Sequence, residues 1–188
     1  FIPDLIRMLD NVIEYFINNA PDELARARFS ASQERSLGLG AMGFHAYLQK
    51  RGIPFESAMA KSFNLRAFSH IKTEASRATR ELAEERGECP DSKWYGGGVR
   101  NAHLLAVAPN ASSSIICGNT SPSIEPYRAN AFTQKTKTGS ALLKNPFLEK
   151  LLEEKGENTE EVWKTIITNN GSVQHLDCLS DYEKDTFK

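Results

Sequence analysis

The sequence has no surplus of basic charge and no long apolar run. Its 23 lysines and arginines are balanced by 24 aspartates and glutamates, so the formal net charge is −1 at pH 7. A nearly neutral chain has no sequence-wide positive field with which to follow a nucleic-acid backbone. The apolar stretches are too short to cross a bilayer, and no charged-then-apolar leader opens the chain. These absences predict a soluble cytoplasmic protein that binds neither nucleic acid nor a membrane.

Cysteine is also scarce. The three cysteines, Cys89, Cys117 and Cys178, are odd in number and widely spaced. They form neither a disulfide framework nor a C-x-x-C pair for metal or redox chemistry. We therefore expect free thiols in a reducing compartment, and no metal or other cofactor held by this chain.

The apolar content is sufficient for a folded core. With 188 residues and 40% hydrophobic content, the chain is long enough for one domain or for part of one. It begins FIPDLIRML without methionine and ends in DYEKDTFK, a pattern typical of the opening turns of a further helix. We expect residues 1–188 to be part of a single domain that is incomplete at both ends.

Helical patterns predominate along the chain. An amphipathic pattern covers residues 3–19, a second helix starts near Pro21, and a long one runs from Ser57 until glycine and proline stop it near residue 87. Two further helices are expected at 145–155 and 160–169. The apolar run HLLAVAP, residues 103–109, predicts a strand buried on both faces, and ANAFTQKT, residues 129–136, predicts a second strand.

The stretch GLGAMG, residues 38–43, matches the G-x-G-x-x-G spacing of dinucleotide-binding folds. That motif requires a buried strand directly before its first glycine, and the preceding SASQERS is polar and charged. We interpret Gly40 and Gly43 instead as small faces on a helix that begins near Ser36 and packs closely against another element. A dinucleotide-dependent oxidoreductase remains a rival interpretation, which a strand ending at Gly38 would support.

A better phosphate candidate is LLAVAPNASSSIICGNTSPSIEP, residues 104–126. The apolar run ends at Pro109, and small hydroxyl and amide side chains follow where a short helix would begin. The free N–H groups of Asn110 to Ser114 would point outward, with the positive end of the helix dipole behind them. Such a turn binds phosphate without any lysine. A serine-rich N-cap followed by a plain loop explains the same residues equally well.

The segment PNASSSIICGNTSPSIEPY resembles the phosphate-loop segment of the large, catalytic subunit of class I ribonucleotide reductases. The stretches RSLGLGAMGF, ERGECP, GVRNAHLLA and RANAFTQKTKTGSALLKNPFLEKLLEEKG agree with that family in the same order, so the resemblance covers essentially the whole chain. It implies an α/β fold in which this chain is part of the family's ten-stranded α/β barrel, predominantly helical with a few strands.

The resemblance also implies a function. The whole enzyme would reduce ribonucleoside diphosphates to deoxyribonucleoside diphosphates by radical chemistry, and this chain would hold the substrate's diphosphate. The residues that carry over as the diphosphate-binding loop are Pro109, Asn110, Ala111, Ser112 and Ser113. The family's radical cysteine, redox cysteines and paired tyrosines belong to stretches not found here, so no catalytic residue carries over.

The implied partners are the ribonucleoside diphosphate, the rest of the large subunit, and a small radical-generating subunit with a dinuclear metal centre. Thioredoxin or glutaredoxin would reduce the full enzyme. An adenosylcobalamin-dependent class exists within the same family, but RSLGLGAMGFHAYLQ and GSVQHLDCLSDYEK are more similar to class I. The other alternative is a helical interaction module without a small-molecule site.

Several other residues invite a chemical role. Cys117 follows the candidate loop, but a short apolar helix is expected to bury it as a structural residue. Glu125 and Tyr127 would line the barrel mouth or belong to a proline-built turn. His45, on a helix, and His103, on a strand, are expected to be hydrogen-bonded core histidines rather than bases.

Overall fold

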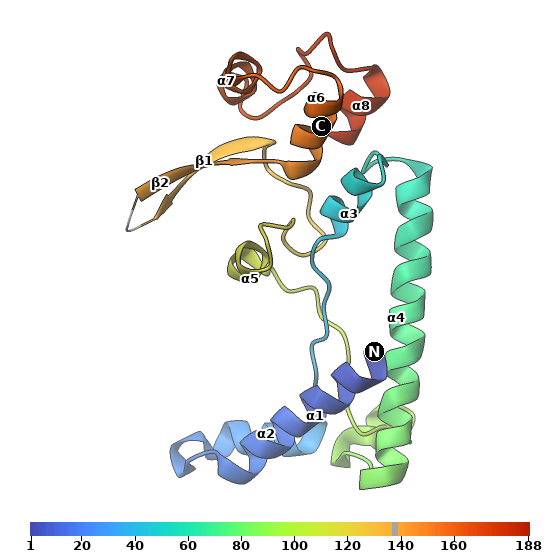
Figure 1. Cartoon of the computed structure of the whole chain (residues 1–188). Coiled ribbons are helices and arrows are strands. Elements are labelled where there is room, and N and C mark those ends of the chain that lie inside the picture. The colour runs from blue at the N-terminus through green and yellow to red at the C-terminus, as the bar shows by residue number, and fades with distance from the viewer. Residues whose placement is uncertain (137–138) are drawn as a thin grey trace. The chain divides into compact units, whose positions relative to one another are not determined.

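The computed structural model describes residues 1–136 and 139–188, which are mostly helical (Figure 1). The chain forms two compact units, unit 1 (Phe1–Ala41 and Asn64–Ala108) and unit 2 (Met42–Phe63 and Pro109–Lys188). The described elements are, in order, α1 (Ile2–Asn19), η1 (Asp22–Leu24), α2 (Ala25–Glu34), α3 (Phe44–Lys50), α4 (Ala58–Arg86), η2 (Pro90–Tyr95), α5 (Ala111–Ile116), β1 (Ala131–Thr136), β2 (Gly139–Lys144), α6 (Pro146–Glu154), α7 (Glu160–Thr168) and α8 (Asp181–Thr186).

Unit 1 is built on α1, α2 and most of α4, and these helices lie where the sequence predicts them. Proline in the first turn of α1 fits a position where its missing N–H costs nothing, and Asp4 complements the positive end of the helix dipole. The apolar side of α1 meets the small residues of α4 in a core of Ile6, Leu37, Ala75, Ala78 and Leu82.

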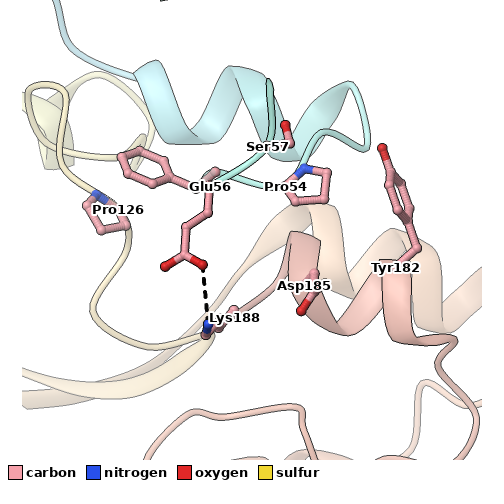
Figure 2. A pocket seen from close by; sticks show the side chains of 8 residues that line it. Pro54, Glu56, Ser57, Pro126, Tyr182, Asp185 and Lys188 are labelled. Atoms are coloured by element: carbon pink, nitrogen blue, oxygen red, sulfur yellow. Dashed lines mark hydrogen bonds and ion pairs between the residues drawn. The ribbon is translucent and has the colours of Figure 1, made fainter. Parts of the chain in front are cut away.

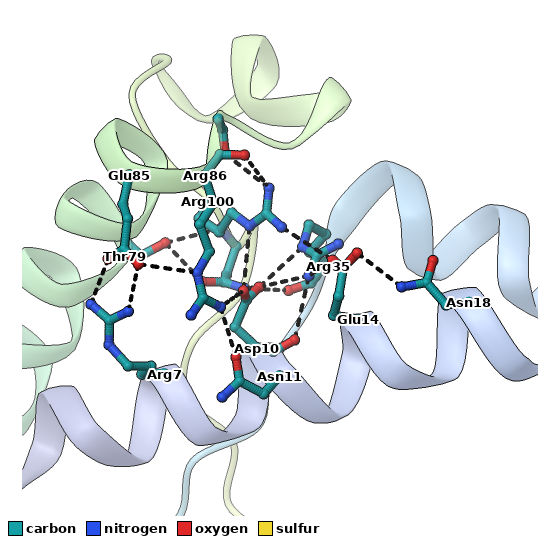
Figure 3. Close-up of polar contacts among 12 residues, drawn as sticks. Arg7, Asp10, Asn11, Glu14, Asn18, Arg35, Thr79, Glu85, Arg86 and Arg100 are labelled. Atoms are coloured by element: carbon teal, nitrogen blue, oxygen red, sulfur yellow. Dashed lines mark hydrogen bonds and ion pairs between the residues drawn. The ribbon is translucent and has the colours of Figure 1, made fainter.

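A buried carboxylate lies at the centre of unit 1 (Figure 3). Asp10 is fully buried, accepts from Arg35 Nε at 3.0 Å and from Asn101 Nδ2 at 3.0 Å, and forms ion pairs with Arg86 at 3.1 Å and Arg100 at 3.4 Å. Burial by itself raises the pKa of Asp10. The charges of Arg35 and Arg100 and the hydrogen bonds from Asn101 and Arg35 outweigh burial, so the pKa falls below its ordinary value. Asp10 therefore stays ionised and ties α1 to three other segments.

Unit 2 has a separate apolar core between the hairpin and the last three helices. Capping side chains begin these helices: Asn145 for α6, Thr159 for α7, and Ser180, which forms a capping box with Glu183, for α8. The core consists of Ala131, Leu148, Leu152, Trp163, Ile166, Val173, Leu176, Leu179 and Phe187. The helices predicted at 145–155 and 160–169 are confirmed, and the caps explain where they begin.

Three buried amide side chains connect the elements of unit 2. Asn145 Nδ2 donates to Gln49 Oε1 at 2.8 Å and to Asn130 Oδ1 at 2.9 Å. Asn130 Nδ2 donates to the carbonyl oxygens of Gly171 at 3.0 Å and Phe187 at 2.7 Å. This network holds α3, β1, α6 and the end of α8 together without any charged group.

The strand predictions are correct at one position and wrong at another. Residues 129–136 contain β1, which pairs antiparallel with β2 from Ala131 opposite Lys144 to Thr136 opposite Gly139. The second strand of this hairpin was not predicted, because GSALLKN lacks a run of β-branched residues.

The run HLLAVAP does not form a strand buried on both faces. It is extended, with one parallel bridge between Leu105 and Leu39, and the side chains of Leu105 and Val107 are 37% and 71% exposed. Within the described residues, segment 37–39 is the only segment whose backbone is hydrogen-bonded alongside it. Leu104 packs against the core of unit 1, whereas Leu105 and Val107 stay exposed.

None of the helices within residues 1–136 and 139–188 is both long and apolar enough to span a bilayer.

Candidate functional site

The glycine-rich stretch GLGAMG is extended at its start, so the helix expected from Ser36 is wrong. Segment 37–39 runs parallel to segment 103–106, with backbone hydrogen bonds Leu37 to His103 at 2.8 Å, Leu39 to Leu104 at 2.9 Å and Ala106 to Leu39 at 3.0 Å. Helix α3 begins only at Phe44. Glycines make a helix unfavourable here, and an extended partner satisfies the backbone instead.

The glycines nevertheless serve the close packing that the sequence predicts. A Cβ placed on Gly40 would lie 2.6 Å from the carbonyl oxygen of Ala106. A Cβ placed on Gly43 would lie 2.8 Å from Thr120 Oγ1, and Gly43 has a φ of +78° that other residues rarely adopt. Both positions therefore require glycine, for contact between chain segments.

The start of α3 is already occupied by protein acceptors. The N–H of Gly43 donates to the carbonyl oxygen of Ser121 at 2.8 Å, and the N–H of Ala46 donates to Ser121 Oγ at 3.0 Å. The extended segment 37–39 also contains Gly38 rather than ending before it. Both observations argue against a dinucleotide pyrophosphate at GLGAMG.

The second candidate, the loop Pro109–Ser113, leads into the short helix α5. Asn110 is its N-cap residue, with a left-handed φ of 52° and no side-chain cap bond. The first helical bond runs from the Ser114 N–H to the Asn110 carbonyl at 2.9 Å. Within the described residues, no acceptor receives the N–H groups of Ala111, Ser112 or Ser113. The predicted helix start is confirmed, and it presents successive free donors.

The hydroxyl groups at this loop are of two kinds. The side chains of Ser112 and Ser113 are exposed, whereas Ser114 is buried and its Oγ donates to the carbonyl oxygen of Ala111 at 3.0 Å. No lysine or arginine occurs in residues 109–127. An anion at this loop would therefore meet backbone N–H groups, the hydroxyls of Ser112 and Ser113, and the positive end of the peptide dipoles.

A polar framework supports the segment after α5. The Thr120 N–H donates to the Ser114 carbonyl at 3.1 Å, and the Tyr127 hydroxyl donates to the Asn119 carbonyl at 3.2 Å. The Tyr127 N–H donates to His45 Nδ1 at 2.9 Å. Burial lowers the pKa of His45 to about 4, so the ring is neutral at pH 7 and able to accept. The prediction of His45 as a satisfied core histidine is confirmed, but nothing in the sequence indicated its hydrogen bond with the Tyr127 N–H.

Comparison with known families identifies the fold. The family model described as ribonucleotide reductase, barrel domain, matches residues 2–96 and 91–188. The chain belongs to this family. Its membership confirms the expected α/β class, with the chain as a partial, mostly helical segment of the barrel.

Relatives of the ribonucleotide reductase family are similar over the whole chain. A Frog virus 3 (isolate Goorha) protein named as a ribonucleoside-diphosphate reductase large subunit is 52% identical over 187 residues, 98% of this chain and 33% of that protein. The ribonucleoside-diphosphate reductase large subunit of Invertebrate iridescent virus 3 is 48% identical over 191 residues, 100% of this chain and 30% of its own.

A solved structure of a ribonucleotide reductase is also similar to this chain in sequence and in fold. The Actinobacillus ureae class Id ribonucleotide reductase alpha subunit is 43% identical, with a TM-score of 0.88, over 100% of this chain and 34% of that chain. The chain thus spans about a third of the length of these relatives.

The predictions that Cys117 and His103 are buried are both wrong. Cys117 is exposed, because only Ser114 is buried within α5 and the helix ends before the thiol reaches a core. His103 is exposed rather than in a core, since the extended run that carries it is covered on one side only, but the expected hydrogen bond is present, between its Nδ1 and Ser36 Oγ at 3.0 Å. Glu125 lies in a turn closed by its N–H on the Pro122 carbonyl at 3.1 Å, as the proline-built interpretation requires.

Left-handed backbone is concentrated in the loop Pro109–Ser113 and in the segment that follows α5. Of the non-glycine residues with positive φ in the described part of the chain, Asn110, Asn119 and Ser123 lie within 14 positions, with φ of 52°, 57° and 45°. Ser123 Oγ is also buried without a hydrogen-bond partner among the described residues. Such unfavourable features often gather at functional sites.

The pocket in Figure 2 lies elsewhere in unit 2 and does not suit a diphosphate. Its volume is about 420 Å³, and its lining contains the carboxylates of Glu56 and Asp185. The ammonium of Lys188 is already paired with Glu56 Oε2 at 3.4 Å. Two carboxylates facing one engaged cation would repel a polyanion. The lining residues are Pro54, Phe55, Glu56, Ser57, Pro126, Tyr182, Asp185 and Lys188.

No group of three or more histidine, cysteine, aspartate and glutamate side chains within residues 1–136 and 139–188 is arranged to hold a metal ion.

Proposed function

We propose that this chain is the diphosphate-binding part of the large, catalytic subunit of a ribonucleoside-diphosphate reductase. In this proposal the loop Pro109–Ser113 holds the diphosphate of the substrate. The observation that carries it is the start of α5, where the N–H groups of Ala111, Ser112 and Ser113 have no acceptor within the described residues. These N–H groups occur in a chain that belongs to the ribonucleotide reductase family.

The chemistry of the loop favours phosphate over other ligands. Successive N–H groups at a helix start point in one direction and converge on an anion, and hydrogen bonds to a charged acceptor are stronger than neutral ones. Pro109 has no N–H of its own, and the left-handed Asn110 turns the chain into α5. Because backbone donors recognise charge and not a base, this loop binds the diphosphate of any ribonucleotide alike.

The remaining chemistry is assigned to other parts of the enzyme. The proposed reaction reduces a ribonucleoside diphosphate at its 2′-carbon, after a cysteine radical removes the 3′-hydrogen and while paired cysteines supply electrons. The rest of the large subunit would provide those cysteines, a small subunit with a dinuclear metal centre would generate the radical, and thioredoxin or glutaredoxin would restore the thiols. We place this enzyme in the cytoplasm.

The test uses a complete large subunit in which this chain replaces the matched third of the Frog virus 3 relative, called the chimeric subunit below. Ser112→Pro removes one N–H at the second helical position and should weaken binding of cytidine 5′-diphosphate at least tenfold. Ser112→Ala removes one hydroxyl and should cost about 0.5–1.5 kcal/mol. Binding of cytidine, which lacks phosphate, should change little in either variant. Dissociation constants from titration calorimetry measure both effects.

Gly40→Ala is the matched control in the glycine motif. The new methyl group would crowd the Ala106 carbonyl at 2.6 Å, so the thermal midpoint should fall while diphosphate affinity of the folded protein stays unchanged. Loss of diphosphate binding in Gly40→Ala with a normal midpoint, together with normal binding in Ser112→Pro, would show that the phosphate is assigned to the wrong loop.

A further inference from the structure

The start of α3 contacts the chain directly after α5. Ser121 is fully buried and accepts from α3 through its carbonyl and its hydroxyl, at 2.8 Å from the Gly43 nitrogen and 3.0 Å from the Ala46 nitrogen. Beside it, Thr120 Oγ1 fills the space where a side chain on Gly43 would begin. The last glycine of GLGAMG is therefore closed against residues 120–121 and not against a ligand.

This contact continues to the diphosphate loop through Ser114. The Thr120 N–H donates to the Ser114 carbonyl at 3.1 Å, and Ser114 is the buried residue of α5. The Ser114 N–H holds the Asn110 carbonyl at 2.9 Å, and its Oγ holds the Ala111 carbonyl at 3.0 Å. Each link is a hydrogen bond to backbone, so a displacement of Thr120 changes the direction of the loop's N–H groups.

A second link from α3 reaches the same segment. Buried His45 accepts the Tyr127 N–H at 2.9 Å, and the Tyr127 hydroxyl holds the Asn119 carbonyl at 3.2 Å. Asn119 directly precedes Thr120, so two independent contacts from one helix fix residues 119–121.

We propose that Gly43, Thr120 and Ser121 are positioning residues for the diphosphate loop, an inference that rests on the proposed function. None of them touches the diphosphate. Their contact sets the orientation of α5, and thereby aims the N–H groups of Ala111, Ser112 and Ser113. Gly43 then serves phosphate binding indirectly, by holding residues 120–121, which in turn hold Ser114 of α5.

The two ends of α3 offer a matched pair of variants. Gly43 and Gly52 both have left-handed backbone, with φ of +78° and +62°. A Cβ on Gly52 would meet nothing within 4 Å, whereas a Cβ on Gly43 would meet Thr120 Oγ1 at 2.8 Å. Alanine at either position carries the same kind of backbone strain, but only Gly43→Ala displaces Thr120.

The experiment measures dissociation constants of cytidine 5′-diphosphate and cytidine, together with thermal midpoints, in the chimeric subunit. Gly43→Ala should weaken diphosphate binding roughly tenfold, as expected when a charge-assisted hydrogen bond is misaligned. Gly52→Ala should weaken it by less than about twofold while lowering the thermal midpoint comparably. Adding Thr120→Ala to Gly43→Ala removes the crowding hydroxyl and should restore most of the lost affinity, a positive coupling between the two sites.

Ser121→Ala gives a second test that needs no backbone strain, for the case in which Gly43→Ala does not fold. It deletes the hydroxyl that accepts from Ala46 and should weaken diphosphate binding about threefold without changing cytidine binding. Equal diphosphate affinities in Gly43→Ala and Gly52→Ala, or unchanged affinity in Ser121→Ala, would overturn the positioning role. If Ser112→Pro still weakens binding, the loop assignment survives that result; if it does not, the proposed function itself fails.

Discussion

Units 1 and 2 each contain buried polar side chains that connect several segments, but the chemistry of these side chains differs between the two units. In unit 1 the buried polar centre is the carboxylate of Asp10, surrounded by Arg35, Arg86 and Arg100. In unit 2 it is a set of neutral amides around Asn145. Within the described residues nearly every buried polar side-chain atom has a partner in both units, because a buried group without one costs free energy.

The two units should respond differently when one side chain of the charged cluster or of the amide network is replaced. Removing one side chain from the charged cluster leaves its partners with uncompensated charge, which is far more costly to bury than an unpaired amide. A neutral network loses hydrogen bonds and a helix cap but creates no net charge. Unit 1 should therefore be more sensitive to a single isosteric substitution than unit 2.

The largest effect is expected for Asp10→Asn. It preserves the shape of the side chain but leaves three arginines with less compensation, which should lower the opening free energy of unit 1 by about 3–5 kcal/mol. Native-state hydrogen exchange of the chimeric subunit, read on peptides from α1 and α4, measures this region by region.

The matched control for charge is Arg77→Ala on α4, whose ion pairs with Glu74 and Glu81 lie on the surface. Its exchange pattern should be indistinguishable from that of the unchanged protein, since exposed pairs contribute little. If Asp10→Asn proved no more harmful than Arg77→Ala, the charged centre would not be what holds unit 1 together.

A somewhat smaller effect is expected for Asn145→Ala in unit 2. The variant loses the cap of α6 and leaves the amide oxygens of Gln49 and Asn130 without this donor, so the opening free energy should fall by about 2–4 kcal/mol. Exchange on peptides from α6 and β1 measures it. Asn145→Ser retains a capping oxygen and should recover about 1 kcal/mol of the loss. Full recovery by serine would show that the cap alone mattered and the network did not.

The smallest effect is a pH dependence that separates the two units. His45 has a pKa of about 4 in the folded chain, below the ordinary 6.5, so the unfolded state binds more protons. Its contribution is fully present above pH 6.5 and is lost as the pH falls towards 4. Asp10, whose pKa is lowered from 3.8, loses its contribution only at more acidic pH.

Exchange between pH 7 and 4.5 should therefore show unit 2 weakening before unit 1. His45→Asn keeps a neutral acceptor for the Tyr127 N–H, and in this variant the opening free energy of unit 2 should depend much less on pH. An unchanged slope in that variant, or earlier weakening of unit 1, would contradict the assignment to His45.

The helices could be predicted closely because their signals are local. The proline in the first turn of α1 and the Asn145-Pro146 start of α6 place helix beginnings within a residue or two of the observed ones. The loop Pro109–Ser113 and the helix after it were likewise found from turn and cap residues. Its role as a diphosphate site stays a prediction, based on the family's pattern and on the free donors at α5.

The extended segments could not be predicted in the same way. GLGAMG was assigned to a helix, and HLLAVAP to a fully buried strand, yet the two lie side by side with one face of the apolar run uncovered. A strand's hydrogen bonds and burial are supplied by residues distant in sequence, so its own pattern does not reveal its neighbours.

By itself the sequence determined most of the helices, the position of the candidate loop and the family resemblance, because caps, periodicity and ordered motifs are encoded in neighbouring residues. Only the tertiary structure decided what the glycines contact, that Cys117 and His103 are exposed, and that His45 accepts the Tyr127 N–H. The same applies to the charged centre of Asp10, whose three arginines come from positions 35, 86 and 100. Such contacts depend on which distant segments the chain brings together, and burial then makes each polar partner obligatory.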